Sequence, residues 1–176
     1  MKARILNLLI FGLIIACQPG PGPFPAGRAS AELNGKPWVS NQSNCAINTA
    51  CYKGRLGINL YKHRPDGTKE SSFGFHKIPY QVGVYSVVPA VYANFCTDTF
   101  VNSSFNTLTP DGDVSKDSYG SVNVSTNYVQ ITDINRKTGE VRGKFNVTYV
   151  IFIRQDRTSP DTIRVTNGQF QAWIRD

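Results

Sequence analysis

The feature that most constrains the fold is a regular alternation of apolar and polar side chains near the C-terminal end of the chain. From Val141 to Ile153 the odd-numbered positions are apolar apart from one glycine, and the even positions are polar as far as Thr148. Successive side chains of a β-strand point to opposite faces of a sheet. Residues 140–155 are therefore predicted to form a long strand with one buried face.

The same signals recur along the chain after residue 28, where no long stretch has helical spacing. Asn34-Gly35 and Asp66-Gly67 are typical hairpin turns. The predicted strands are 29–34, 36–40, 53–62, 70–77, 83–89, 91–97, 119–125, 128–134, 140–155 and 162–175. We expect an all-β fold: a single antiparallel meander of about 8–10 strands. It would close as a β-barrel or flatten into a β-sandwich, and periodicity does not distinguish the two.

The last predicted strand changes phase in its middle. Ile163 and Val165 are odd-numbered, whereas Phe170 and Ala172 are even-numbered. A slip of one residue moves every following side chain to the other face. We therefore predict a β-bulge at Asn167-Gly168.

The N-terminus has the pattern of an export signal. Lys2 and Arg4 precede an apolar run over 5–15, and Ala16 precedes Cys17. A charged start, a short apolar centre and a small residue before the cut are typical of a signal peptide. The run is shorter than the roughly 20 residues that a spanning helix needs. Residues 1–16 are predicted to be a lipoprotein signal peptide, against a plain secretory signal or a buried N-terminal element. Cys17 would carry a diacylglyceryl group and an amide-linked acyl chain such as palmitate.

Residues 17–28 combine the lipidated cysteine with a segment rich in Pro and Gly, which predicts an extended tether. Residues 29–176 then form the all-β domain. Gln18 replaces the Asp that commonly retains lipoproteins in the inner membrane, so we expect a lipid anchor in the outer membrane. The periplasmic and cell-surface sides both remain open.

The predicted mature chain is basic. Residues 17–176 keep 17 of the 19 Lys and Arg residues and all 12 acids, for a net charge near +5. The basic residues are scattered, which favours a solvated surface, with attraction to anionic glycans or lipid headgroups as the alternative. We expect no nucleic-acid partner for an exported, tethered chain.

Three cysteines remain besides Cys17, and an exported compartment is oxidising. Cys45 and Cys51 flank a short loop and form the favoured disulfide. Pairing of either one with Cys96 remains open, and the third cysteine would stay free.

No motif for catalysis stands out. His63 and His76 are the two histidines, and neither has a second ligand at metal-site spacing. The carboxylates fall mostly at predicted turns, where they favour solubility. Residues 110–113 with Asp117 have oxygen ligands for calcium but lack the EF-hand spacing. We expect no metal, no cofactor and no enzyme activity.

Aromatic residues are dense between 73 and 105, which favours a packed core and leaves a ligand cavity as the alternative. From residue type alone, we expect any ligand contacts at Trp38, Tyr85, Tyr92 and Trp173.

Four segments resemble those of small Bacteroidota lipoproteins whose function is not known. They are an N-G-K-x-W motif at 34–38, a G-x-Y motif at 83–85, a G-x-F motif at 143–145 and an N-G-x-F motif at 167–170. The resemblance implies an exported all-β domain and no particular activity. The segments 45–51 and 95–118 depart from this pattern.

Two non-catalytic roles follow from these observations. The favoured hypothesis is a membrane-anchored binding module for a glycan, lipid or protein ligand. The alternative is a structural or accessory subunit of an envelope complex, which would show an exposed apolar patch or a bare strand edge instead of a cavity.

Overall fold

The structure is a computed structural model that describes residues 27–49, 52–90 and 99–175. The predicted signal peptide and almost all of the tether therefore lie outside the described residues. The strands are β1 (Arg28–Leu33), β2 (Lys36–Ser40), β3 (Gln42–Ile47), β4 (Arg55–His63), β5 (Lys69–Pro79), β6 (Gly83–Val88), β7 (Val101–Leu108), β8 (Ser115–Ser121), β9 (Tyr128–Asn135), β10 (Glu140–Arg154) and β11 (Thr162–Ile174). The described part of the chain contains no helix, which confirms the all-β prediction.

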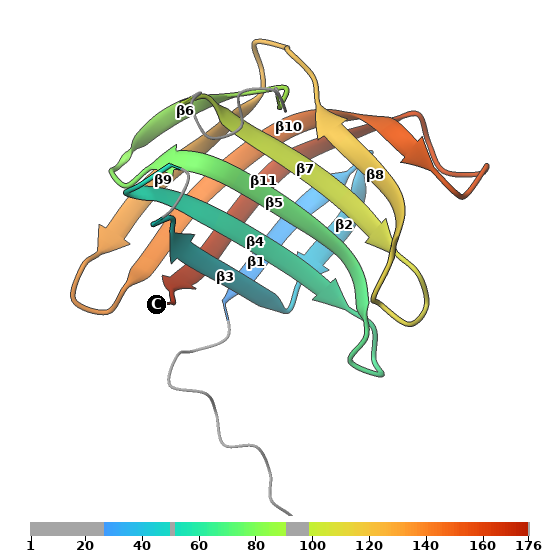
Figure 1. Cartoon of the computed structure of the whole chain (residues 1–176), viewed down its shortest axis with the longest axis horizontal. Helices are drawn as coiled ribbons and strands as arrows, with labels where there is room; N and C mark the ends of the chain where they lie inside the picture. Colours follow the sequence, from blue (N-terminus) through green and yellow to red (C-terminus); the bar gives the residue numbers. More distant parts are fainter. Residues whose placement is uncertain (1–26, 50–51, 91–98, 176) are drawn as a thin grey trace, which may run out of the picture.

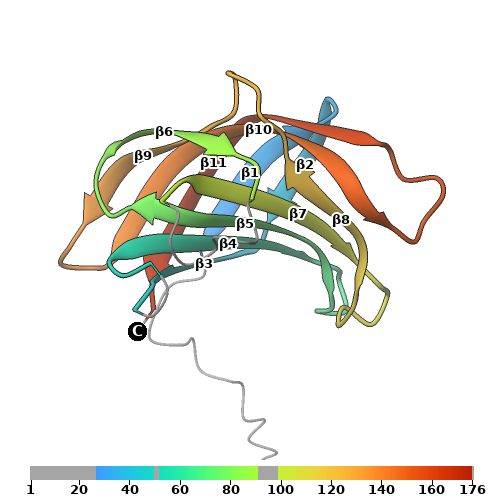
Figure 2. The same ribbon diagram turned by 45° about the horizontal axis from the view of Figure 1, so that its top comes forward.

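The strand ladders close into a ring, as in a flattened barrel (Figures 1 and 2). Around the ring, β11 pairs with β3, then β4, β5, β7, β8 and β10 follow, and β10 pairs with β11 again. In two places around the ring, the space between two long strands is filled by different short strands at its two ends. Between β11 and β4, β3 fills one end, while β1 and β2 fill the other. Between β7 and β10, β8 fills one end, and β6 with β9 fills the other.

Two short contacts depart from a purely antiparallel meander. Strand β11 pairs in parallel with β3, and β6 pairs in parallel with β7. Both contacts join strands that are not linked by a tight hairpin, so the chain can run in the same direction in each.

The predicted turns and bulge form as expected. Asn34 and Gly35 have φ values of 49° and 76°, and Gly67 has a φ of 87°. Asn167 has a φ of 54°, and the register of β10 against β11 shifts between Phe145 and Val147. Ile163, Val165, Phe170 and Ala172 are consequently all buried despite their change of phase. The bulge at 167–168 is confirmed.

The interior of the ring is filled by aromatic side chains and is a packed core. Phe73 lies at its centre, with ring centroids of Phe105 at 4.6 Å and of Phe145 and Tyr149 both at 5.8 Å. The Tyr149 hydroxyl lies 2.6 Å from Ser103 Oγ, which donates to the Gly74 carbonyl oxygen. Burial raises the pKa of Tyr149, so it stays protonated. Of the aromatic residues between 73 and 105, Phe73, Phe75 and Phe105 are therefore core, Tyr80 and Tyr85 pack against it half-buried, and Phe100 is exposed.

Three parts of the strand prediction differ from the structure. Strands β3 and β7 were not expected, and β8 spans 115–121 where we expected 119–125. Both unexpected strands bury small polar side chains, Ser43 in β3 and Ser103 in β7. These interrupt the apolar alternation that identifies a strand in a sequence. The predicted strand 91–97 lies outside the described residues.

The predicted Cys45–Cys51 disulfide is not supported, because Cys45 is a free thiol in the structure. Its side chain faces the core from β3 and is 1% exposed. Burial raises the pKa of the Cys45 thiol to about 12, which disfavours the thiolate that disulfide formation needs. Cys51 and Cys96 lie outside the described residues.

Candidate functional site

One end of the barrel opens into a cavity of about 620 Å³, which we call the mouth cavity. The turns at 34–35, 64–68, 109–114 and 155–161 lie around this end of the barrel. The lining residues are Leu33, Asn34, Lys36, Pro37, Trp38, Lys62, Arg64, Glu70, Ser71, Phe105, Thr107, Leu108, Lys116, Asp117, Tyr119, Ser159, Pro160 and Ile163. Its size falls within the range of small-molecule sites in proteins.

The floor of the mouth cavity is aromatic and belongs to the core. Trp38 is 4% exposed, and its indole N–H donates to Ser71 Oγ at 3.0 Å. Its ring packs edge-on against Phe73, with centroids 4.8 Å apart. Phe105 and Tyr119 complete the floor, with ring centroids 5.7 Å apart. These rings are held by packing, so the floor is a rigid apolar surface.

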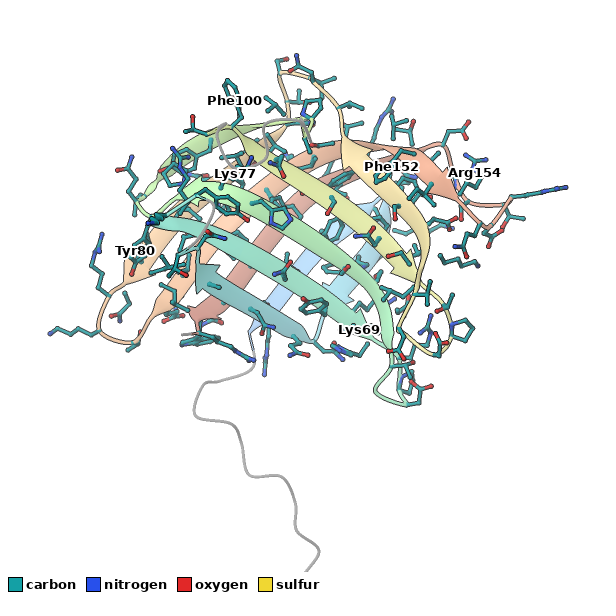
Figure 3. The ribbon with its side chains drawn as sticks, in the orientation of Figure 1. Lys69, Lys77, Tyr80, Phe100, Phe152 and Arg154 are labelled. Carbon is teal, nitrogen blue, oxygen red and sulfur yellow. The ribbon has the colours of Figure 1, made fainter. Side chains whose placement is uncertain are left out.

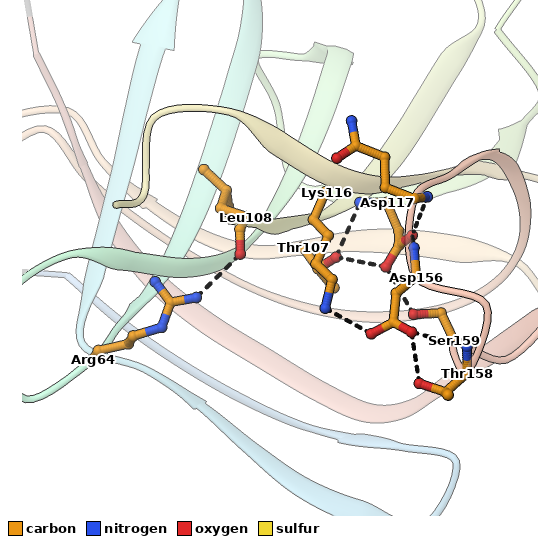
Figure 4. Close-up of polar contacts among 9 residues, drawn as sticks. Arg64, Thr107, Leu108, Lys116, Asp117, Asp156, Thr158 and Ser159 are labelled. Atoms are coloured by element: carbon orange, nitrogen blue, oxygen red, sulfur yellow. Dashed lines mark hydrogen bonds and ion pairs between the residues drawn. The ribbon is translucent and has the colours of Figure 1, made fainter. Parts of the chain in front are cut away.

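Arg64 ties two of the surrounding turns together. Its guanidinium donates to the carbonyl oxygens of Lys69 at 2.6 Å, Leu108 at 3.1 Å and Thr109 at 3.2 Å (Figure 4 shows the bond to Leu108). This joins the β4–β5 turn to the β7–β8 turn. Because its guanidinium is occupied by these bonds, Arg64 mainly holds the two turns in place and is less available to bind a ligand.

Asp117 organises the β10–β11 turn from the opposite side (Figure 4). Its carboxylate accepts the backbone N–H groups of Gln155 at 2.9 Å and Asp156 at 3.0 Å, and the Ser159 hydroxyl at 2.7 Å. Thr107 Oγ1 donates to it as well, at 3.1 Å. Burial acts to raise the pKa of Asp117, but these hydrogen bonds outweigh it and the pKa is lowered. Asp117 is therefore an ionised, fully occupied acceptor.

Ion pairs occupy much of the rim. Lys62 Nζ lies 2.7 Å from Glu70 Oε1, and Lys116 Nζ lies 2.6 Å from Asp156 Oδ2. The hydrogen bond from Lys116 and those from Thr158 lower the pKa of Asp156. Lys36 also lines the cavity but is exposed, and no described acid forms an ion pair with it. It is the rim cation best placed to meet an incoming anion.

A second hollow of about 580 Å³ lies on the outer face of β1, β10 and β11. Its outward side chains are mostly polar or charged, including Arg28, Arg142, Lys144 and Gln169, but the exposed Val39 also lines it, and its buried Phe170 belongs to the core. Arg142 is already paired with Glu140 at 2.7 Å. The second hollow has one aromatic residue in its lining, whereas the mouth cavity has the three packed rings of Trp38, Phe105 and Tyr119. The mouth cavity is therefore the better candidate for a small ligand.

The predicted ligand contacts do not gather at one place. Trp38 lies in the floor of the mouth cavity, as described above. Tyr85 lies on β6, and its hydroxyl donates to the Gln81 carbonyl oxygen in the β5–β6 connection at 2.9 Å. Trp173 lies near the end of β11, beside Asn44 and Glu140. Trp38 instead pairs with Ala31 of β1, which lies across from the middle of β11, between the partners of Thr166 and Gln169. Tyr92 lies outside the described residues, as does the predicted lipidation site Cys17.

Sequence reasoning missed most of the mouth cavity. Phe105 lies on a strand that was not predicted and Tyr119 on one that was displaced. Asp117 was considered only as a turn residue or as an oxygen ligand for calcium. In the sequence, the Lys116-Asp117 pair before the aromatic Tyr119 is the one pattern that could have pointed to the cavity, and by itself it does not indicate a binding site. Three of the four partners of the Asp117 carboxylate lie about 40 residues away in the chain, so spacing does not reveal them.

The chemistry of the site favours binding. The lining contains no histidine and no cysteine, and its buried carboxylate has a lowered pKa. Within the described residues, no group of three or more His, Cys, Asp or Glu side chains is arranged to hold a metal ion.

No family model, curated protein or solved structure matches this chain. In the described part of the chain, no helix has the length and apolar character needed to cross a membrane.

Proposed function

We propose that this protein is an exported, lipid-anchored binding module that holds a small amphipathic anion in its mouth cavity. The observation that carries the proposal is the mouth cavity itself, with its rigid floor of Trp38, Phe105 and Tyr119 beneath a charged rim. The anchor rests on the sequence around Cys17. Attachment through two or more acyl chains makes membrane binding stable.

The cavity supports a ligand with an apolar body and an acidic group. The floor offers ring edges and apolar carbons, and its buried rings do not present an open face for stacking on a sugar. Lys36 at the rim supplies a positive charge for a carboxylate or phosphate. A fatty acid or a similar amphipathic molecule matches this combination better than a neutral glycan.

Native mass spectrometry of the protein purified gently from a periplasm tests the proposal. We expect a mass excess that disappears on denaturation, and its value identifies the ligand class. Lys36→Glu should lower the occupied fraction at least tenfold. Lys69→Glu is the matched control, because Lys69 is exposed near the same end but does not line the mouth cavity. A bare mass for the wild-type protein, or equal losses in both variants, contradicts the proposal.

A second role, as an accessory subunit of an envelope complex, is favoured by one surface feature. Val150, Phe152 and Ile153 of β10 are 41%, 55% and 49% exposed, and Phe152 is labelled in Figure 3. Exposed apolar patches of this kind often contact other proteins. If this role holds, Phe152→Ser should shift the detergent-solubilised protein to a smaller species in analytical ultracentrifugation, and an unchanged size would count against it.

A further inference from the structure

The end of the barrel opposite the mouth cavity has an unbalanced charge. We call it the tether end: it comprises Arg28 and the adjoining ends of the strands, the described residues 48–49 and 52–54, the turns at 80–82 and 136–139, and Arg175. The contacts place these parts together. Arg28 pairs with Gln171, the Ile174 N–H donates to the Gly139 carbonyl oxygen, and the Arg136 guanidinium lies 4.6 Å from the centre of the Tyr80 ring.

Basic residues dominate the tether end. Its described basic residues are Arg28, Lys53, Arg55, Arg136, Lys137, Arg142 and Arg175, and its described acids are Asp133 and Glu140. The mouth end, by contrast, has equal numbers of basic and acidic side chains over residues 32–37, 62–70, 108–117 and 154–164. Asp98 and Asp176 lie outside the described residues, and the tether end stays positive even if both are counted with it.

Three of these basic residues are well placed to meet another surface. Lys53, Arg136 and Lys137 are exposed in turns, and none forms an ion pair with a described acid. Val82, in the turn beside Tyr80, is 60% exposed. Basic side chains flanking an exposed apolar residue are typical of surfaces that rest on lipid headgroups.

The chain enters the domain at this same end. Arg28 begins β1, and the segment from Gln18 to Gly27 joins it to Cys17. Ten residues reach at most about 36 Å, even when fully extended. If Cys17 is in the membrane, as the proposed function holds, the tether end is the part of the domain nearest to the lipid.

We propose that the tether end docks on anionic phospholipid headgroups, which directs the mouth cavity away from the membrane. The proposal rests on the lipid anchor of the proposed function, and it adds a contact that does not depend on the acyl chains. The short tether is needed for this contact, because attraction between the basic tether end and an anionic membrane decays within about 10 Å at ordinary salt.

Vesicle co-sedimentation tests the docking with the full mature chain carrying Cys17→Ser, so that acyl chains play no part. We expect binding to phosphatidylcholine vesicles that contain phosphatidylglycerol and little binding to phosphatidylcholine alone. Replacing Lys53, Arg136 and Lys137 with Gln should weaken binding about fivefold for each charge removed. The matched control replaces Lys69, Arg157 and Arg164 with Gln, which removes the same charge from exposed positions at the mouth end.

The outcomes separate this proposal from the proposed function. Retained binding in the mouth-end variant and loss in the tether-end variant support docking. Equal losses show that only net charge matters, and no binding of the parent chain to anionic vesicles overturns the proposal outright. The lipid anchor is tested separately: an N-terminal peptide of the membrane-bound protein without a diacylglyceryl group would contradict it. The ligand is tested separately by native mass spectrometry.

Discussion

At the scale of single residues, Asp117 is the polar side chain on which the mouth end most depends. It accepts hydrogen bonds from two segments of the chain, β7 and the β10–β11 turn, and stays ionised while buried. Hydrogen bonds to a charged group stabilise more than neutral ones. The sequence indicated only a turn residue or a calcium ligand at this position, because most of its partners are distant in the chain.

Asp117→Asn should lower the free energy of unfolding by about 2 kcal/mol, because the amide removes the charge and turns one acceptor into a donor facing N–H groups. Urea unfolding measures this change. Asp113→Asn is the control, since Asp113 is exposed in the neighbouring β7–β8 turn, and it should stay within about 0.5 kcal/mol of the wild type. Equal effects of the two substitutions would refute the role given to Asp117.

The effect of Asp117→Asn should depend on pH. The lowered pKa of Asp117 means that its stabilising effect is complete above the ordinary Asp value of about 3.9 and is lost as the pH falls through the lower folded-state value. The difference between wild type and variant should therefore be constant above about pH 5 and shrink in acid. His76, whose pKa is lowered by burial and then by Lys77, affects both proteins equally and cancels in the difference.

Cys45 should be unreactive in the folded protein. Its raised pKa of about 12 and its 1% exposure leave almost no accessible thiolate near neutral pH. Alkylation with iodoacetamide followed by peptide mapping, without prior reduction, should modify Cys45 only after unfolding. A peptide linked to Cys51 or Cys96 would instead restore the disulfide predicted from the sequence.

At the scale of elements, the bulge in β11 depends on the absence of a side chain at Gly168. A Cβ there would lie 2.5 Å from the Phe145 carbonyl oxygen and 2.7 Å from its ring. Gly168→Ala should therefore destabilise the protein by about 2 kcal/mol through overpacking, measured by urea unfolding. Gly57→Ala in β4 is the control, because its nearest atom would be 4.0 Å away, and it should be close to neutral. Similar values for both would contradict this packing.

The elements that were predictable from sequence are those whose buried face is apolar. Strand β10 alternates cleanly, and the phase change of β11 revealed its bulge. Strand β7 was not predictable, because it buries Asn102 and Ser103 next to each other, and Ser103 is satisfied by Tyr149 from a strand 46 residues away. The floor of the mouth cavity is assembled by pairings of this kind between distant strands. Trp38 is therefore the one floor residue among the ligand contacts predicted from the sequence.

At the scale of the whole molecule, the two ends of the barrel differ in character. One end holds a cavity over an aromatic floor and has balanced charge, and the other is basic and lies where the tether enters. Ring closure keeps the ends apart, because β10 runs from one to the other over fifteen residues (Figure 1). The proposed arrangement places lipid contact and ligand binding on opposite sides.

The two tryptophans allow the most direct test of the mouth cavity, because Trp38 lies in its floor and Trp173 lies near the other end of the barrel. We would titrate the ¹⁵N-labelled protein with dodecanoate below its micelle concentration and follow the two indole N–H signals by NMR. We expect a saturable shift of the Trp38 signal, weakened by Lys36→Glu, with the Trp173 signal unchanged. A Trp38 signal that does not move, or a shift confined to Trp173, would contradict a ligand site in the mouth cavity.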